Sequence, residues 1–134
     1  MKVLIVDDEK IWRDILEEEM RAGLAGAETK MAESHEEAAR LTAEHVFDLA
    51  VLDMRFPDQA GVQSSEAGEL LYLDLVASNP AMKFIFVSTV TKWFGVLRAR
   101  RQGHPGIVGF LNKNNYNMPD LVAILESAFP PTNP

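Results

Sequence analysis

Short hydrophobic runs alternate with amphipathic stretches along the whole chain. Five apolar runs, most of them rich in β-branched or aromatic residues, predict strands over residues 2–6, 27–31, 48–53, 84–88 and 107–111. Apolar residues at helical spacing predict helices over residues 11–22, 35–45, 69–77, 91–102 and 117–129. Strands and helices that alternate in this way predict an α/β protein whose parallel sheet has helices on both faces.

Polar residues and glycine mark several of the predicted element ends. Gly23 follows the first helical pattern as a stop, and Asn117 precedes the last one as an N-cap. Ser34 and Glu37 have the spacing of a capping box, in which the serine caps the helix and the glutamate reaches back. Residues 56–68 are rich in Pro, Gly, Ser, Gln and Asp, which predicts a loop.

Composition narrows the possible classes of protein. The chain has 134 residues, no cysteine and a formal net charge of −7. This length predicts one domain, and the missing cysteine excludes disulfides, thiolate metal sites and cysteine catalysis. The negative charge argues against nucleic-acid binding by the chain as a whole. No apolar run is long enough to cross a membrane and no signal peptide is present, so we expect a cytoplasmic protein with no membrane partner.

Polar side chains follow four of the predicted strands, at the edge where ligands bind in open parallel sheets. These side chains are Asp7, Asp8, Asp53, Ser88, Thr89 and Lys113. A single aspartate after a strand is usually a turn former or a helix cap, so the prediction of a site rests on the whole set. Ionised carboxylates that share a small site need a counterion, and oxygen ligands favour Mg²⁺ or Mn²⁺. A nearby ammonium group then suits a phosphoryl group.

Four motifs, in order and in register, make the chain resemble the receiver domain of two-component response regulators. Residues 3–9 are similar to the opening strand and acidic pair of that family, and residues 49–57 to its phosphoacceptor strand. Residues 85–88 resemble the strand with the switch hydroxyl, and residues 109–113 the segment with the switch aromatic and the lysine. The resemblance covers residues 1–128 and leaves 129–134 as a proline-rich tail or the start of a linker.

The resemblance implies a fold and a set of partners. The fold is a doubly wound, flavodoxin-like, three-layer α/β/α arrangement with five parallel strands in the order 2-1-3-4-5. The implied phosphoryl donor is a sensor histidine kinase or a phosphotransfer protein. The face made by the fourth helix, fifth strand and fifth helix is implied to control a partner, an attached output domain or a homodimer. A receiver domain assists its own phosphorylation and dephosphorylation and is not a dedicated enzyme.

The resemblance also implies the metal ligands and the phosphorylated residue. Asp53 would accept the phosphoryl group. Asp8, Asp53 and the backbone carbonyl of Arg55 would bind Mg²⁺, with Mn²⁺ as an alternative ion. Asp7 would hold the ion itself or a water molecule bound to it. These roles agree with the physical requirements of phosphoryl transfer, which depends mainly on positioning and on neutralising charge.

The remaining polar residues of the set receive roles around the phosphoryl group. Lys113 would pair with one phosphoryl oxygen, while Ser88, next to Thr89, would bond another and move toward it. Phe110 would turn inward as Ser88 moves. Phosphorylation would then bias a two-state element that ends at the output face.

The chain departs from the family pattern in four places. Asn114 replaces the proline that usually follows the lysine after a cis bond, and a cis bond to any other residue costs about 2.5–4 kcal/mol. A trans bond is therefore favoured there, with Lys113 placed differently. Thr89 replaces a smaller residue and would narrow access to the site. The loop that includes residues 58–64 is longer than usual. It would either cover the site, bind a partner or be a tolerated surface insertion. The predicted helix 91–102 is stretched and carries Trp and Arg residues.

Two other functions remain open at this point. A degenerate receiver would act by binding alone; Asn114 and Thr89 favour it, while the intact acidic residues and Lys113 argue against it. A Mg²⁺-dependent aspartyl phosphatase is disfavoured, because such enzymes place Asp-x-Asp on the first strand and this chain has Asp-Asp-Glu. None of the three histidines is expected to lie near carboxylates, so they receive no role.

Overall fold

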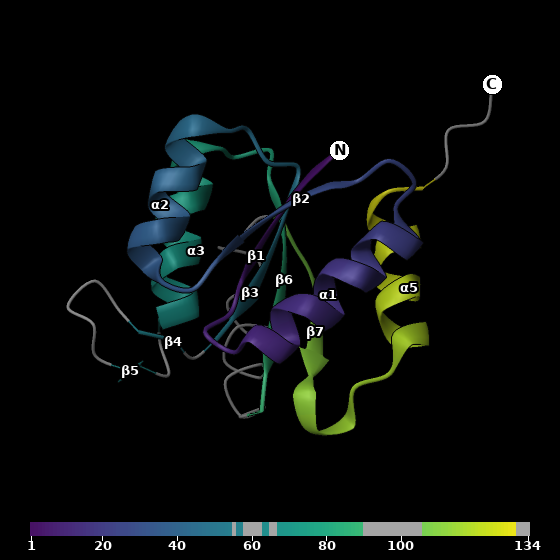
Figure 1. Cartoon of the computed structure of the whole chain (residues 1–134). Helices are drawn as coiled ribbons and strands as arrows, with labels where there is room; N and C mark the ends of the chain where they lie inside the picture. Colours follow the sequence, from purple (N-terminus) through teal and green to yellow (C-terminus); the bar gives the residue numbers. More distant parts are fainter. Residues whose placement is uncertain (55, 58–62, 65–66, 90–105, 131–134) are drawn as a thin grey trace.

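The computed structural model describes residues 1–54, 56–57, 63–64, 67–89 and 106–130. Five parallel strands form one sheet in the order β2-β1-β3-β6-β7 (Figure 1). Their bounds are β1 (Lys2–Val6), β2 (Glu28–Ala32), β3 (Leu49–Asp53), β6 (Lys83–Ser88) and β7 (Ile107–Asn112). Counted within this sheet, the order is 2-1-3-4-5, so the predicted doubly wound fold is confirmed.

Helices cover both faces of the sheet and complete three layers (Figure 1). The described helices are α1 (Lys10–Gly23), α2 (His35–Glu44), α3 (Ala67–Ser78) and α5 (Met118–Ala128). Helices α1 and α5 lie on one face, and α2 and α3 lie on the other. The helix predicted over residues 91–102 lies outside the described residues. Among the helices that are described, none has the length and apolar character needed to cross a membrane.

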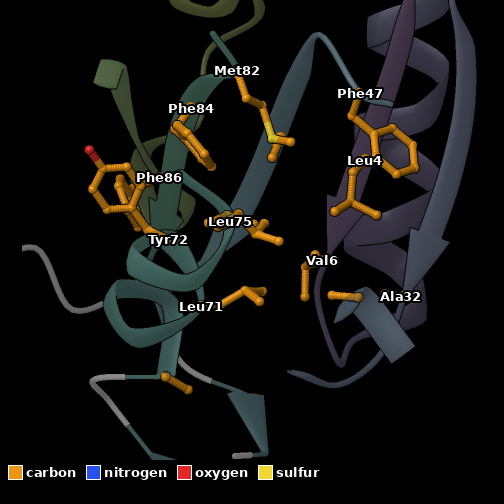
Figure 2. Close-up of a cluster of buried hydrophobic side chains, with 14 of the residues drawn as sticks. Leu4, Val6, Ala32, Phe47, Leu71, Tyr72, Leu75, Met82, Phe84 and Phe86 are labelled. Atoms are coloured by element: carbon orange, nitrogen blue, oxygen red, sulfur yellow. The ribbon is translucent and has the colours of Figure 1, made fainter. Parts of the chain in front are cut away.

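The central strand β3 faces both hydrophobic cores, and all five of its residues are buried. Leu49 and Val51 belong to the core under α1 and α5, whereas Ala50 and Leu52 belong to the core under α2 and α3. This alternation follows from the two-residue period of a strand with a helix layer on each side. Figure 2 shows the α2/α3 core, where the Tyr72 ring meets a neighbouring strand's aromatic side chains edge-on.

The segment predicted as a loop over residues 56–68 contains regular structure, which corrects the sequence prediction. Two short strands, β4 (Phe56–Pro57) and β5 (Gln63–Ser64), pair in antiparallel fashion. Helix α3 begins at Ala67, two residues before the predicted start. Ala67 is fully buried and Gly68 packs on the backbone of β3, so tertiary packing extends the helix into residues whose composition favours a loop.

The predicted helix caps are only partly confirmed. Ser34 is the N-cap of α2, and its hydroxyl accepts a hydrogen bond of 3.2 Å from the backbone N–H of Glu37. The carboxylate of Glu37 accepts from the N–H of Glu33, one residue before the capped position of a standard capping box. Asn117 is the N-cap of α5, but its side chain makes no capping hydrogen bond.

The interpretation that no histidine lies near a carboxylate is wrong for His35. His35 Nε2 lies 3.0 Å from Asp74 Oδ2, a contact that joins α2 to α3. The His35 side chain is 7% exposed, so the pair is mostly shielded from water on the histidine side. His45 contacts Lys2 Nζ at 3.1 Å, and His104 lies outside the described residues.

Candidate functional site

Four acidic side chains meet at the carboxyl edge of the sheet. They are Asp7, Asp8, Glu9 and Asp53, and one carboxylate oxygen from each lies within 4.8 Å of the others. The first three follow directly from the end of β1, and Asp53 is the last residue of the neighbouring strand β3. Asp7 and Asp53 are buried, whereas Asp8 and Glu9 are exposed at the rim. The predicted convergence of the two strand ends is therefore confirmed, and Glu9 joins it.

Lys113 places a single ammonium group among these carboxylates. It follows β7 as the first residue of a short 3₁₀ helix, η2 (Lys113–Asn115). Its Nζ lies 2.7 Å from Asp7 Oδ2, 3.0 Å from Asp53 Oδ2 and 3.4 Å from Glu9 Oε1. The described residues contain no cis peptide bond, so Lys113 reaches the site on a trans backbone.

Burial and charge shift the pKa values of this site in linked ways. Burial raises the pKa of the Asp7 carboxyl, and the hydrogen bonds from Lys113 and from the Glu9 backbone only partly offset this effect. Burial alone would lower the pKa of Lys113, but the charges of Asp53 and Asp7 outweigh it and raise that pKa. The ammonium group is thus held charged beside an acidic cluster that carries more negative than positive charge.

Helix α1 supports the acidic cluster through a residue that the sequence interpretation missed. Arg13 donates a 2.8 Å hydrogen bond to the backbone carbonyl of Asp7 and a 3.0 Å bond to the carboxylate of Glu33. Asp7 Oδ1 also accepts from the backbone N–H of Glu9 at 2.9 Å. The sequence signal for Arg13 is a cation on the buried side of an amphipathic helix, close to Leu16. A buried cation there needs acidic or carbonyl partners.

An aromatic pair borders the ammonium group on the α1 side. Lys113 Nζ lies 5.3 Å from the centre of the Trp12 ring, within the range of a cation–π interaction. Trp12 in turn meets Tyr116 edge-to-face, with ring centroids 5.5 Å apart. These two contacts place an indole ring next to the site, where it can report on Lys113.

The other predicted residues lie on β6 and β7 at the same edge. Ser88 is buried at the end of β6 and pairs with Asn112 in the strand register, while Thr89 is exposed just beyond it. Phe110 is half-buried, and its ring stacks on Phe86 at 6.2 Å between centroids. The strand register therefore brings the hydroxyl residues to the edge that holds Asp53. Arg55 lies outside the described residues.

The donor set at this edge fits a hard divalent cation. Every acidic partner offers a carboxylate oxygen, and the cluster includes both buried and exposed carboxylates. Mg²⁺ prefers oxygen ligands, keeps several of its waters and needs one or two carboxylates from the protein. The exposed rim leaves water access on the side of Asp8, so the residues present match that preference.

Comparison with known proteins places the chain among signalling domains. The family model described as "Response regulator receiver domain" matches residues 3–126. The curated protein "Response regulator protein PilR" of Pseudomonas aeruginosa is 43% identical over 61 residues, which is 46% of this chain and 13% of PilR. The chain thus spans a small part of that relative's length.

Solved structures share the fold along nearly the whole chain. The receiver domain of NtrX from Brucella abortus aligns with a TM-score of 0.75 and 21% identity, covering 97% of this chain and 99% of that one. The response regulator TrrA from Thermotoga maritima, solved in complex with Mg²⁺-BeF, aligns with a TM-score of 0.74 and 22% identity, covering 96% and 98%. A receiver domain from Clostridium thermocellum aligns with a TM-score of 0.70 and 20% identity, covering 95% and 92%.

Proposed function

The chain belongs to the response regulator receiver domains of two-component signalling, and on that premise we propose that Asp53 accepts a phosphoryl group from a phosphohistidine. The observation that carries the proposal is the contact of 3.0 Å between Asp53 Oδ2 and Lys113 Nζ inside an acidic cluster. The phosphoryl donor would be a sensor histidine kinase or a phosphotransfer protein. The domain would comprise residues 1–128, with 129–134 as a tail or linker.

Asp53 acts as the nucleophile of the proposed transfer. A carboxylate oxygen of Asp53 forms a bond to phosphorus as the bond from phosphorus to the donor's imidazole nitrogen breaks, and the electron pair returns to that nitrogen. Lys113 neutralises charge on a phosphoryl oxygen, because its ammonium already lies between Asp53 and Asp7. Arg13 holds the backbone of Asp7 in place during this step.

Mg²⁺ would be held by Asp8, Asp53 and the backbone carbonyl of Arg55, with Asp7 binding the ion or one of its waters. When bound, the ion supplies positive charge that balances the carboxylates and the phosphoryl oxygens. Mn²⁺ has the same preference for oxygen ligands and would occupy the same residues.

The signal would leave the site through Ser88, Thr89 and Phe110. A phosphoryl group on Asp53 offers acceptor oxygens at the edge where Ser88 ends its strand, so the hydroxyl would move toward it. Phe110 would then change its packing against Phe86. Phe110 packs against the α2/α3 core from β7, whose opposite face packs on α5, so a change at β7 would reach the face used by a partner, an output domain or a second copy.

The test is intact-mass measurement after incubation with acetyl phosphate, with and without Mg²⁺. We expect one added phosphoryl group that requires Mg²⁺ and is absent in Asp53→Ala, while Asp14→Ala, an exposed aspartate of α1, still gains it. A chain that gains no phosphoryl group, and whose tryptophan fluorescence does not respond to beryllofluoride, would instead be a binding-only receiver. The placement of Lys113 beside Asp53 supports the first outcome, despite Asn114 in the usual proline position.

A further inference from the structure

Two residues that depart from the family pattern contact each other in the structure. The side-chain amide of Asn114 donates a 3.1 Å hydrogen bond from Nδ2 to the backbone carbonyl of Thr89. The two residues follow different strands: Asn114 lies in η2, after β7, and Thr89 directly follows β6. The bond therefore joins the segment that carries Lys113 to the residue next to Ser88.

This bond continues the connection between the two strands beyond the last ladder pair. The register of β6 and β7 ends with Ser88 opposite Asn112. One residue later, the carbonyl of Thr89 accepts a hydrogen bond from a side chain, that of Asn114. The backbone N–H of Asn114 is also used, because it donates to Asn112 Oδ1 at 2.9 Å. Lys113 thus lies between Asn112, which pairs with Ser88 in the sheet, and Asn114, which is hydrogen-bonded to Thr89.

Proline, the usual family residue at this position, could make neither bond. It has no backbone N–H and no side-chain amide. The backbone around Lys113 is therefore held by two hydrogen bonds of Asn114 in this chain, and not by a proline ring. One of those bonds connects η2 to the carbonyl of Thr89, the residue that directly follows the predicted switch residue Ser88, and the other stays within the segment around Lys113.

We propose that Asn114 is a positioning residue that couples the location of Lys113 to that of the Ser88–Thr89 segment. The inference rests on the proposed phosphoryl acceptance by Asp53 and adds a residue to it. When Ser88 and Thr89 shift toward a phosphoryl group, the hydrogen bond between Asn114 Nδ2 and the Thr89 carbonyl transmits the shift to the backbone next to Lys113. Without the bond, Lys113 samples more positions and a smaller fraction of molecules is ready to bind the phosphoryl group.

The test compares Asn114→Ala and Asn114→Pro with the control Asn115→Ala. Asn115 is the next residue of η2, is exposed, and makes no side-chain hydrogen bond within the described part of the chain. Two quantities are measured for each variant. The first is the affinity for beryllofluoride in saturating Mg²⁺, and the second is the position of the Trp12 indole ¹H–¹⁵N resonance, which reports on the neighbouring Lys113. The resonance is assigned with Trp12→Phe, and thermal unfolding confirms that each variant is folded.

We expect Asn114→Ala to weaken beryllofluoride binding about 3- to 10-fold, the range for one lost hydrogen bond, and to shift the Trp12 resonance. Asn114→Pro should also bind beryllofluoride more weakly than the wild type and show a shifted Trp12 resonance. Asn115→Ala should keep the wild-type affinity and resonance. If both Asn114 variants bind beryllofluoride as the wild type does, the inference about Asn114 is overturned while the proposed function stands. If the wild type itself binds no beryllofluoride, the proposed function fails and this inference fails with it.

Discussion

A Cβ atom on Gly68 would lie 2.5 Å from the backbone carbonyl oxygen of Asp53. Real side-chain carbons do not approach an oxygen this closely, so the first turn of α3 touches β3 only because residue 68 is glycine. The N–H of Gly68 also donates a 3.2 Å hydrogen bond to the carbonyl of Met54. The backbone at the end of β3 is therefore fixed by direct contact with a helix.

Gly68→Ala should destabilise the protein, although alanine is normally the better helix former by about 1 kcal/mol. The clash involves backbone atoms of Asp53 and Met54, which cannot move as a side chain can, so we expect a net loss of about 1–3 kcal/mol. Urea unfolding measures the loss. Gly23→Ala is the control, because the nearest atom to its Cβ belongs to a side chain, Leu125 Cδ1, and not to the backbone. A Gly68→Ala protein more stable than the wild type would refute this close packing.

Mg²⁺ should raise the unfolding temperature, because the proposed ion site is formed by an acidic cluster that exists only in the folded state. At a Mg²⁺ concentration about ten times Kd, linkage predicts about 1.4 kcal/mol of added stability. Asp8→Asn should reduce this gain, since it removes an exposed carboxylate of the cluster without disturbing the core. Glu126→Gln, an exposed change on α5, should keep the full gain. Equal gains in both variants would place the ion elsewhere.

The contact between His35 and Asp74 should contribute measurably to the packing of α2 on α3. Asp74→Ala leaves a buried imidazole without this partner, and we expect a loss of about 1–2 kcal/mol in the free energy of unfolding. Asp14→Ala breaks an exposed ion pair with Lys10 and should cost less than about 0.5 kcal/mol. A double-mutant cycle with His35→Ala isolates the pair, and zero coupling energy would show that the contact adds nothing.

Glu19 should make stability fall as the pH rises from acidic to neutral values. Burial, together with the charge of Glu18, raises the pKa of Glu19 above its ordinary value of 4.5. The folded state therefore binds the proton more tightly than the unfolded state, and ionisation at higher pH costs stability. Its Oε2 atom is buried and has no hydrogen-bond partner among the described residues.

Glu19→Gln should consequently unfold at a higher temperature than the wild type at pH 7, and this advantage should vanish below pH 4.5. Glu126→Gln, exposed on α5, serves as the comparison for loss of a charge without burial. Thermal unfolding across this pH range gives the answer. An advantage for Glu19→Gln that is independent of pH would mean that ionisation is not its source.

The hydrophobic pattern was sufficient to predict the sheet and the convergence of its polar ends. Strand β3 is buried on both faces, and a continuous apolar run such as residues 49–52 is the direct signature of that position. The sequence predicts that Asp7 and Asp53 lie close together, because Asp7 directly follows β1 and Asp53 ends β3 in one parallel sheet. That inference needs only strand direction, and not the details of side-chain packing.

Contacts between distant side chains could not be predicted from the sequence pattern. His35 and Asp74 are 39 residues apart, and no periodicity connects them. Asn114 and Thr89 are recognisable in the sequence as departures from the family pattern. Their hydrogen bond, however, depends on how the segments that follow β6 and β7 lie relative to each other. The start of α3 was missed for a related reason, since Gly68 favours a loop by propensity and a helix only through its contact with Asp53.

The strand order has a consequence for the way the chain acquires its structure during synthesis. Strand β1 is flanked by β2 and β3, so the residues of three neighbouring strands and two helices are all available for folding once residue 53 has left the ribosome. The acidic residues Asp7, Asp8 and Asp53 could then assemble before their cation, Lys113, has been made. A nascent chain of this kind carries uncompensated negative charge at one edge of a half-built sheet. A divalent ion bound at the proposed site would balance this charge during that interval and would favour early folding of this half of the domain.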